Sequence, residues 1–548
     1  MPSSSSYVSV APEISDDLDP DSCFYVSSLL SAFLRNADRL AVIHAGGSLT
    51  YAELLDEVFR LARALESRGL GRGDGIAAFE DNTPGTLLIN LASRLLGCYF
   101  VSLPTYAAPP EQARMLESAE VLALVYEPEL SGDRAVELAD RRAVPAILSL
   151  GPGPVGADLL ALAADEPGTP FPPRARDTDL GDILFTSGST GSGPKAAVYT
   201  FARLGELTKA WLSFGGRGAA SAAAYRDPDC RLLRFFATTI SPGVAIMPTL
   251  LNGGTIVLQR KFDAGAVLRA IEEQRITVLA LYPSHLYQLL DHPDLTRVDL
   301  STLRLLVYYG APMSPTRLRQ AITAFGPVLC QIYGQSETRI LCHLGPEDHR
   351  LDRPERLRSI GRPLPGVELQ VRTDTGVAGV GEIGEIYVRT PYRMNYYWRE
   401  PELTAKTIID GWTRTTDLGY QDAEGYVYLV DRVRDIVLVN ANNCYTVDIE
   451  NVLTGHPAVR EAVAVGMPDP HTGEAVHAAV VRHPHVEVSE SELRELVRAE
   501  LSELDAPRTV LFLDEIPATR TGKRDKNSVR ELVSQRLAPP HTTGRSHT

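Results

Sequence analysis

The chain alternates between two spacings of hydrophobic and polar positions. Between Thr50 and Gly69, apolar residues recur at the spacing of one helix face, and Thr50 and Glu53 have the spacing of a capping box. A glycine just past the last apolar position is typical of a helix C-terminus. This segment is therefore predicted to be a helix that begins after Thr50.

Elsewhere the apolar positions form short unbroken runs that end at turn residues, as buried strands do. Such runs alternate with helical segments through most of the chain, which is typical of parallel sheets covered by helices. The predicted fold class is therefore α/β. The clearest runs are "GTIVLQ" (254–259), "ITVLALYP" (276–283) and "LRLLVYYG" (303–310).

The pattern changes near Arg434. The segment that follows has the mixed pattern of a compact α+β module, in which a second capping box, Ser489 with Glu492, opens a helix predicted to run through Leu504. We therefore predict a large N-terminal domain of parallel sheets covered by helices and a small, mobile α+β C-terminal domain. The predicted divisions are a flexible arm at 1–24, the large domain at 25–433, the small domain at 434–535 and a disordered tail at 536–548.

Composition disfavours several classes of function. The formal net charge of -15 disfavours nonspecific binding to nucleic acid or anionic membranes, because both partners are negatively charged. No stretch of about 18 apolar residues occurs, so we expect no membrane span. The N-terminus has no basic start with an apolar core, and the six cysteines show no paired spacing. Reduced thiols in a cytoplasmic chain are therefore expected.

The segment "FTSGSTGSGPK" (185–195) is rich in glycine and hydroxyl residues and follows an apolar run that predicts a strand end. It is not a Walker loop, because Pro194 stands where that motif has its lysine and Ala196 follows Lys195 in place of a hydroxyl residue. Its backbone amides and hydroxyls can still surround a polyphosphate, with Lys195 as a point charge. A flexible surface linker is the alternative interpretation.

Three further polar segments could bind a nucleotide or a metal. Glu337 lies in a turn after a predicted strand and could hold magnesium, although acids in loops are usually only solvated. Asp417 follows two threonines and could accept hydrogen bonds from a ribose diol, or lie in a surface turn. Lys523 follows a glycine in a polar loop, where a lysine is more often an exposed charge.

In their order and spacing these segments resemble the adenylate-forming superfamily of acyl-CoA synthetases, peptide-synthetase adenylation domains and luciferases. The resemblance covers roughly residues 25–535. It implies a reaction in which a carboxylate attacks the α-phosphate of ATP, magnesium pyrophosphate leaves, and a nucleophile, often a thiol, then displaces AMP. The matching motifs are "FTSGSTGSGPK", "IYGQSET", "GEIGEIYVRTPYRMNYYW", "TRTTDLGYQDAEGYVYLVDRVRD" and "PATRTGKRDKN".

The resemblance implies catalytic roles for three residues. Lys523 matches the lysine that bridges the carboxylate and the α-phosphate, Glu337 the magnesium-binding acid and Thr338 the hydroxyl near the α-phosphate. Losing a preorganised contact of this kind typically costs about 100-fold or more in rate. The loop residues that would cover the β- and γ-phosphates are Thr186, Ser187, Gly188, Ser189, Thr190, Gly191 and Lys195.

The resemblance also implies the remaining nucleotide contacts. Asp417 matches the ribose-binding aspartate, Arg432 the arginine that helps to fix the same sugar, and Tyr333 the aromatic residue near adenine. Arg434 occupies the hinge position, about which the small domain is expected to turn between the two half-reactions. The implied cofactors are ATP and Mg²⁺, with CoA as one candidate acceptor.

Several positions depart from the family pattern. Thr238 stands roughly where many acyl-CoA synthetases carry a histidine, and Ala441 where many thioester-forming members carry a glycine beside the expected pantetheine tunnel. The pattern of Asn443 with 448–450 is closer to the fatty acyl-AMP ligase branch, which delivers acyl groups to carrier proteins. The acceptor therefore stays open.

The expected substrate pocket includes Thr238, His285, Tyr309, Gly310 and Arg339, which lie in segments that match pocket segments of relatives. Arg339 sits where small residues are frequent. If its side chain faces the pocket, a small or acidic substrate is expected; an outward orientation is the alternative.

The sequence favours an ATP-dependent, AMP-forming ligase that adenylates a carboxylic acid and passes the acyl group to CoA or to a carrier-protein thiol. Two alternatives stay open: an enzyme that activates another small anion or uses an amine acceptor, and a non-catalytic nucleotide-binding relative. Retention of Lys523, Glu337, Asp417 and Arg432 argues against the last, because a protein without catalysis has no chemical need for all four.

Overall fold

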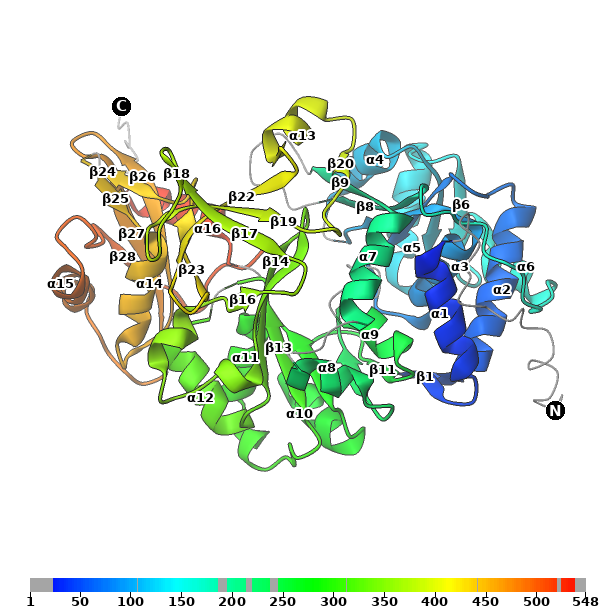
Figure 1. The fold of residues 1–548 in the computed structure, drawn as a ribbon, viewed down its shortest axis with the longest axis horizontal. Coiled ribbons are helices and arrows are strands. Elements are labelled where there is room, and N and C mark those ends of the chain that lie inside the picture. The colour runs from blue at the N-terminus through cyan, green and yellow to red at the C-terminus, as the bar shows by residue number, and fades with distance from the viewer. Residues whose placement is uncertain are drawn as a thin grey trace, which may run out of the picture.

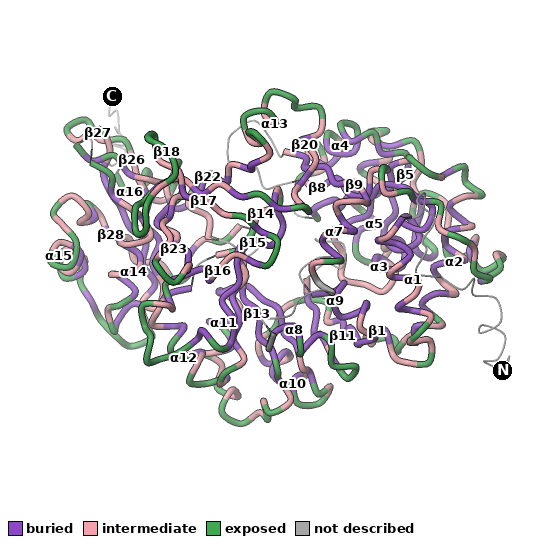
Figure 2. Tube along the Cα trace, viewed as in Figure 1, coloured by how far each residue is buried: buried purple, intermediate pink, exposed green. Residues whose placement is uncertain are grey.

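The computed structural model describes most of the chain (Figure 1). Side chains are described for the same residues except 211–212 and 219–220. Figure 2 shows that buried residues follow the sheets and that exposed residues gather in the loops and on the outer helices. The described ranges are 23–105, 107–185, 195–212, 219–236, 245–311, 313–440, 442–519 and 524–537.

The N-terminal part of the large domain contains an eight-stranded sheet, here called sheet B. Its strands are parallel except β9, which pairs antiparallel with both β8 and β20. Because β20 comes from much later in the chain, it ties the middle of the sequence to this sheet. In spatial order the strands are β20 (Tyr396–Tyr397), β9 (Ala196–Thr200), β8 (Leu180–Phe185), β4 (Tyr99–Leu103), β3 (Gly75–Phe79), β5 (Val121–Tyr126), β6 (Ala146–Ser149) and β7 (Ala157–Asp158).

A nine-stranded sheet, sheet A, follows in the large domain. The three predicted apolar runs form its parallel strands β11, β12 and β13, with β10 between β11 and β12, which confirms the strand predictions. Leu305 and Leu306 pack into different cores because successive side chains of a strand face opposite sides. The spatial order is β16 (Arg362–Pro363), β15 (Arg339–Leu344), β14 (Leu329–Gln335), β13 (Leu305–Tyr309), β12 (Val278–Leu281), β10 (Arg231–Arg234), β11 (Thr255–Leu258), β1 (Leu40–His44) and β2 (Gly47–Thr50).

Helices flank both sheets (Figure 1). The predicted helix after Thr50 is α2, and the Thr50 side chain accepts from the Glu53 amide while the Glu53 carboxylate accepts from the Thr50 amide. This reciprocal capping box satisfies backbone donors that would otherwise lack partners. The helices of the large domain are α1 (Phe24–Arg35), α2 (Tyr51–Ser67), α3 (Pro84–Leu96), α4 (Pro109–Ser118), α5 (Pro128–Asp140), α6 (Leu159–Ala164), α7 (Phe201–Leu212), α8 (Ala219–Arg226), α9 (Ile246–Leu251), α10 (Ala264–Glu273), α11 (Pro283–Leu290), α12 (Pro315–Phe325) and α13 (Pro401–Thr407).

A six-stranded antiparallel sheet, sheet C, completes the large domain. The prediction of parallel sheets did not include it. Long alternating strands such as β22 pair directly with the strands next to them in the chain, which antiparallel geometry permits without a crossover helix. The strands are β17 (Glu368–Thr373), β18 (Gly376–Val377), β19 (Gly384–Arg389), β21 (Ile408–Ile409), β22 (Trp412–Gln421) and β23 (Val427–Arg432).

The chain passes from sheet C to the sheet of the small domain, sheet D, between β23 and β24, where the domain boundary was placed. Ser489 caps α15 as predicted, but that helix ends at Glu500 instead of Leu504. The Ser502 hydroxyl accepts from the Leu504 amide, and this local turn replaces the helical bond. The elements are β24 (Val437–Val439), β25 (Asn442–Cys444), α14 (Thr446–Gly455), β26 (Val459–Asp469), β27 (Gly473–Arg482), α15 (Glu490–Glu500), β28 (Val510–Phe512) and α16 (Lys526–Leu537).

Hydrogen bonds and one ion pair join the small domain to the large one. Both the amide and the hydroxyl of Thr446, at the start of α14, donate to Asp431 of β23 at 2.6 and 2.9 Å. Arg358 Nη2 lies 3.0 Å from Asp448 Oδ1. These contacts hold α14 against the edge of the large domain.

The folded ends differ slightly from the predicted divisions. Cys23 is buried and α1 begins at Phe24, so both residues belong to the large domain and not to the arm; α16 runs to Leu537. The rest of the predicted arm and tail lies outside the described residues. All six cysteines are described, and they are buried and form no disulfides. In the part of the chain that the structure describes, no helix is long and apolar enough to cross a membrane.

Candidate active site

The predicted ribose-binding residues lie together on sheet C. Asp417 of β22 and Arg432 of β23 are direct partners across the antiparallel pair, and Arg432 Nε donates to Asp417 Oδ1 at 3.1 Å. Asp417 is buried, whereas the Arg432 side chain is 48% exposed. A fixed carboxylate thus lies beside a guanidinium group that a ligand can still reach.

Two side chains of β14 hold the other oxygen of this carboxylate. The Tyr333 hydroxyl donates to Asp417 Oδ2 at 2.6 Å, and Gln335 Nε2 donates to the same oxygen at 2.8 Å. Burial and the neighbouring Asp417 charge raise the pKa of Tyr333 well above its ordinary value, so its phenol stays protonated and donates. Gln335 was not predicted; its place two residues after Tyr333, on the same strand face, was the available signal.

The phosphate-side residues come from two sheets. Glu337 lies in the turn between β14 and β15, and its Oε1 accepts from the Tyr397 hydroxyl at 2.7 Å. Tyr397 belongs to β20 of sheet B, and Lys195 Nζ lies 5.7 Å from the centre of its ring. Lys195 and Glu337, predicted from separate motifs, therefore meet at Tyr397. Tyr397 stands in the quoted "MNYYW" segment but was not singled out from the sequence.

The donors here fit a magnesium ion that is shared with a ligand. Glu337 supplies one carboxylate, and no group of three or more His, Cys, Asp or Glu side chains in the described ranges could hold a metal alone. Mg²⁺ is commonly held by one or two carboxylates, with substrate phosphates and waters completing its shell. Glu337 therefore fits an ion that arrives with a polyphosphate.

The structure separates Thr338 from the rest of the turn. Thr338 is fully buried, and its hydroxyl faces the Arg339 carbonyl at 3.5 Å. Ser336, on the other side of Glu337, is exposed. In this arrangement Ser336 is accessible to solvent, whereas Thr338 is not. Ser336 is thus the better candidate for the role predicted for Thr338.

Two predicted pocket residues lie in an aromatic cluster at the end of sheet A. The His285 ring stacks on Phe262, with centroids 4.2 Å apart, and Tyr309 packs against Tyr282 at 5.0 Å. Burial lowers the pKa of His285 to about 4, so the imidazole is neutral near pH 7. Gly310 follows Tyr309 with a φ of 87°, a left-handed conformation that favours glycine.

Arg339 lies elsewhere. Its guanidinium group is buried against sheet B, 4.0 Å from the centre of the Tyr199 ring of β9 and 3.6 Å from Asp182 Oδ2 of β8. This contact gives the charge a protein partner, so the argument for an acidic substrate finds no support in the observed geometry.

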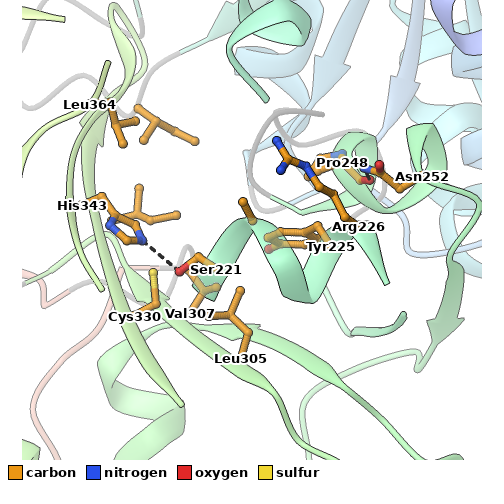
Figure 3. A pocket seen from close by; sticks show the side chains of 13 residues that line it. Ser221, Tyr225, Arg226, Pro248, Asn252, Leu305, Val307, Cys330, His343 and Leu364 are labelled. Atoms are coloured by element: carbon orange, nitrogen blue, oxygen red, sulfur yellow. Dashed lines mark hydrogen bonds between the residues drawn. The ribbon is translucent and has the colours of Figure 1, made fainter. Parts of the chain in front are cut away.

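A small apolar cavity lies behind β14 (Figure 3). Ile332 and Ile340 line it, and Ile332 is the neighbour of Tyr333, whose side chain faces the opposite side of the strand toward Asp417. Polar residues also line it: the Ser221 hydroxyl and His343 Nε2 lie 2.9 Å apart, and Arg226 and Asn252 belong to the same wall. The cavity has room for about 20 Å³, enough for one water molecule.

Several predicted residues lie outside the described part of the chain: the loop 186–191, Thr238 and Lys523. The neighbour of Lys523 is described. Arg524 forms an ion pair with Glu450 at 2.9 Å and a hydrogen bond with Tyr287 of α11, so the chain next to Lys523 contacts the large domain. The predicted hinge residue Arg434 lies in the connection between sheets C and D.

A fixed carboxylate with tyrosine and arginine, a second carboxylate beside a lysine, and a small C-terminal domain docked nearby define an enzyme of the adenylate-forming class. The chain belongs to the AMP-binding enzyme family: that family's model matches residues 31–398, and the model of the AMP-binding enzyme C-terminal domain matches residues 448–523.

Its relatives include ligases with different acceptors. The chain is 33% identical to the medium/long-chain-fatty-acid–CoA ligase FadD8 of Mycobacterium tuberculosis, over 92% of this chain and 89% of that one. It is 40% identical to the amide bond synthetase McbA of Marinactinospora thermotolerans, with a TM-score of 0.84, over 93% and 99%. MatB of Rhodopseudomonas palustris, 28% identical over 94% and 100%, gives a TM-score of 0.84 in its ATP-bound form and 0.75 in its apo form.

Proposed function

We propose that this protein is an ATP-dependent, AMP-forming ligase that joins a carboxylic acid to AMP, releases pyrophosphate and then transfers the acyl group to a nucleophile. The carrying observation is that two anchored carboxylates, Asp417 and Glu337, converge at the carboxyl end of β14 and the turn that follows it. Family membership supports the chemistry, and ATP is the nucleotide that this family uses.

The residues around Asp417 would bind the ribose of ATP. Asp417 is already held by Tyr333, Gln335 and Arg432, so it needs little rearrangement to accept hydrogen bonds from a diol. Preorganisation of this kind reduces the entropy that binding costs. Arg432, half exposed, is placed to contact the same sugar.

The residues around Glu337 would bind the triphosphate. Lys195 supplies a positive charge, Ser336 a hydroxyl group and Glu337 one ligand for Mg²⁺. When bound, Mg²⁺ would neutralise negative charge on the departing pyrophosphate. Tyr397 keeps Glu337 oriented by donating to one of its oxygens, which leaves the other oxygen for the metal.

Lys523 would stabilise the charge that develops as acid and α-phosphate join. Its role rests on the motif resemblance and on the docking of Arg524 against α11. The higher TM-score with ATP-bound MatB than with apo MatB also supports a domain arrangement suited to the first half-reaction.

The acid would be largely apolar. The aromatic cluster around Tyr309 and His285, at the end of sheet A, offers apolar surface for the acid.

The acceptor would be a thiol of CoA or of a carrier protein, as in the acyl-CoA ligase relatives. An amine is the second candidate, because the 40% identity with McbA exceeds the 33% identity with FadD8 over similar coverage. In either case the acyl adenylate is the shared intermediate.

Pyrophosphate exchange into ATP, measured over a panel of aryl, short-chain, long-chain, amino and dicarboxylic acids, tests adenylation. CoA, a phosphopantetheinylated carrier protein and a set of simple amines are then added separately to the best acid. Exchange without any acid dependence would contradict the proposal. Amide formed in the absence of any thiol would identify the amine candidate.

A further inference from the structure

Two hydrogen bonds and one ion pair formed by side chains of sheet B hold the Glu337 turn of sheet A. The Tyr199 hydroxyl of β9 donates to the Ser336 carbonyl, and the Tyr397 hydroxyl of β20 donates to Glu337. The third contact is the ion pair between Arg339, the first residue of β15, and Asp182 of β8. The turn is therefore held by the sheet that also carries Lys195.

Arg339 provides the most extensive of these contacts. Its side chain is 3% exposed and lies with its guanidinium carbon 4.0 Å from the centre of the Tyr199 ring, a stacked arrangement that favours arginine over lysine. The same tyrosine donates to Ser336, two residues before Thr338. One side chain of sheet B thus contacts both ends of the turn.

The backbone at Arg339 is strained, and the turn is closely packed. Arg339 has a φ of 59°, in the left-handed region that residues other than glycine adopt uncommonly. A Cβ at Gly334 would lie 1.9 Å from the Arg339 carbonyl oxygen, so the two strands approach each other without room for another atom. The side-chain contacts of Arg339 explain why this conformation persists.

Asp182 is shared by two guanidinium groups. Arg94 Nη2 lies 2.7 Å from its Oδ1, while Arg339 approaches Oδ2. Both the Arg94 and the Asp182 side chains are 2% exposed or less. Because Arg94 remains as a partner, loss of Arg339 does not leave a buried carboxylate alone, and the fold is expected to survive.

We propose that Arg339 is a positioning residue that fixes the Ser336–Thr338 turn of sheet A onto sheet B, so that Glu337 and Lys195 bind one triphosphate together. This inference rests on the proposed adenylation activity. The phosphate-binding groups come from two different sheets, and a shift of about 1 Å between such groups can cost about 100-fold in rate.

The test compares Arg339→Met, Arg339→Lys and Arg339→Gly with the unmodified protein. Arg339→Met is expected to lower kcat/KM for pyrophosphate exchange by about 10- to 100-fold and to raise the Mg²⁺ concentration needed for half-maximal exchange. Calorimetry with a non-hydrolysable ATP analogue, with and without Mg²⁺, is expected to show loss of the magnesium-dependent part of binding. Arg339→Lys should restore part of both effects.

Arg339→Gly separates positioning from backbone strain, because glycine accepts the left-handed conformation freely. If backbone strain alone explains the arginine at this position, the melting temperature of Arg339→Gly equals or exceeds that of the unmodified protein, and its exchange activity keeps the same Mg²⁺ dependence. That result would overturn the proposal. Arg372→Met, which removes a guanidinium stacked on Tyr387 and Trp412 in sheet C, is the matched control and should change neither readout.

The outcomes also distinguish this inference from the proposed function. If the unmodified protein shows no acid-dependent exchange, the function is contradicted, and the calorimetry still tests the Arg339 contact through magnesium-dependent binding. If exchange is normal and Arg339→Met equals the unmodified protein in both readouts, only the positioning role is refuted. Should Arg339→Met fail to fold, Tyr199→Phe takes its place, because it removes one hydrogen bond to the turn. This variant must also raise the Mg²⁺ concentration needed for half-maximal exchange, by a smaller factor.

Discussion

Tyr397 of sheet B donates a hydrogen bond of 2.7 Å to Glu337 of sheet A, and so links two motifs that are about sixty residues apart in the sequence. Burial and the Glu337 charge raise the pKa of Tyr397, which keeps the phenol protonated and donating across the neutral range. The orientation of Glu337 therefore depends on a residue that carries no charge of its own.

We expect Tyr397→Phe to raise the Mg²⁺ requirement of pyrophosphate exchange and to lower kcat by about 10-fold, because a hydrogen bond to a charged group is worth about 1.5 to 3 kcal/mol. Steady-state exchange at varied Mg²⁺ measures both. Tyr396→Phe is the control, since that neighbouring side chain is exposed. An unchanged Mg²⁺ requirement in Tyr397→Phe would show that the bond does not orient Glu337.

Asp417→Asn is expected to raise KM for ATP by about 10-fold or more, since the variant keeps the shape but loses the charge that pairs with Arg432. Glu385→Gln is the control: Glu385 accepts from Arg414 within the same sheet at 2.7 Å and lies outside the nucleotide cluster. Equal KM values for ATP in both variants would contradict the ribose assignment.

Lys523→Ala is expected to lower pyrophosphate exchange by about 100-fold or more while ATP binding, measured by calorimetry, stays close to normal. The control is Lys209→Ala, which removes a surface lysine paired with Glu206 on α7. Normal exchange in Lys523→Ala would refute the catalytic role taken from the motif.

His285 predicts a pH effect on stability. Burial lowers its pKa to about 4 in the folded protein, whereas the unfolded side chain titrates near 6.5. The unfolded state therefore binds more protons between these values, and stability falls as pH falls. From pH 7 to pH 5 the loss is about 2 kcal/mol. Urea unfolding should show that His285→Phe reduces the loss by about that amount; an equal loss in both proteins would contradict the neutral, buried imidazole.

Local elements could be predicted because their signals are local. The capping box at Thr50 and Glu53 and the apolar runs of β11, β12 and β13 were read correctly, since side-chain spacing alone determines them. The predicted end of α15 at Leu504 was wrong, because the Ser502 hydroxyl accepts the hydrogen bond of the Leu504 amide in place of a helix carbonyl.

The charged members of the site were named from their motifs, together with Tyr333, but the partners Gln335 and Tyr397 were not. Gln335 and Tyr397 donate hydrogen bonds to Asp417 and Glu337 between different sheets, which the fold brings together from distant parts of the chain. The direction of the Arg339 side chain likewise depends on Asp182, more than one hundred and fifty residues earlier. Such pairings follow from the tertiary fold and leave no periodic signal in the sequence.

Gly334 is required because it has no side chain, which lets β14 and β15 approach each other closely. In an alanine scan, Gly334→Ala would lower activity as the loss of a reactive side chain does, because even a methyl group would push β15 away from β14. Libraries intended to retune acid selection should keep this residue unchanged and vary the aromatic cluster around Tyr309 and His285, where substitutions alter shape without parting β14 and β15.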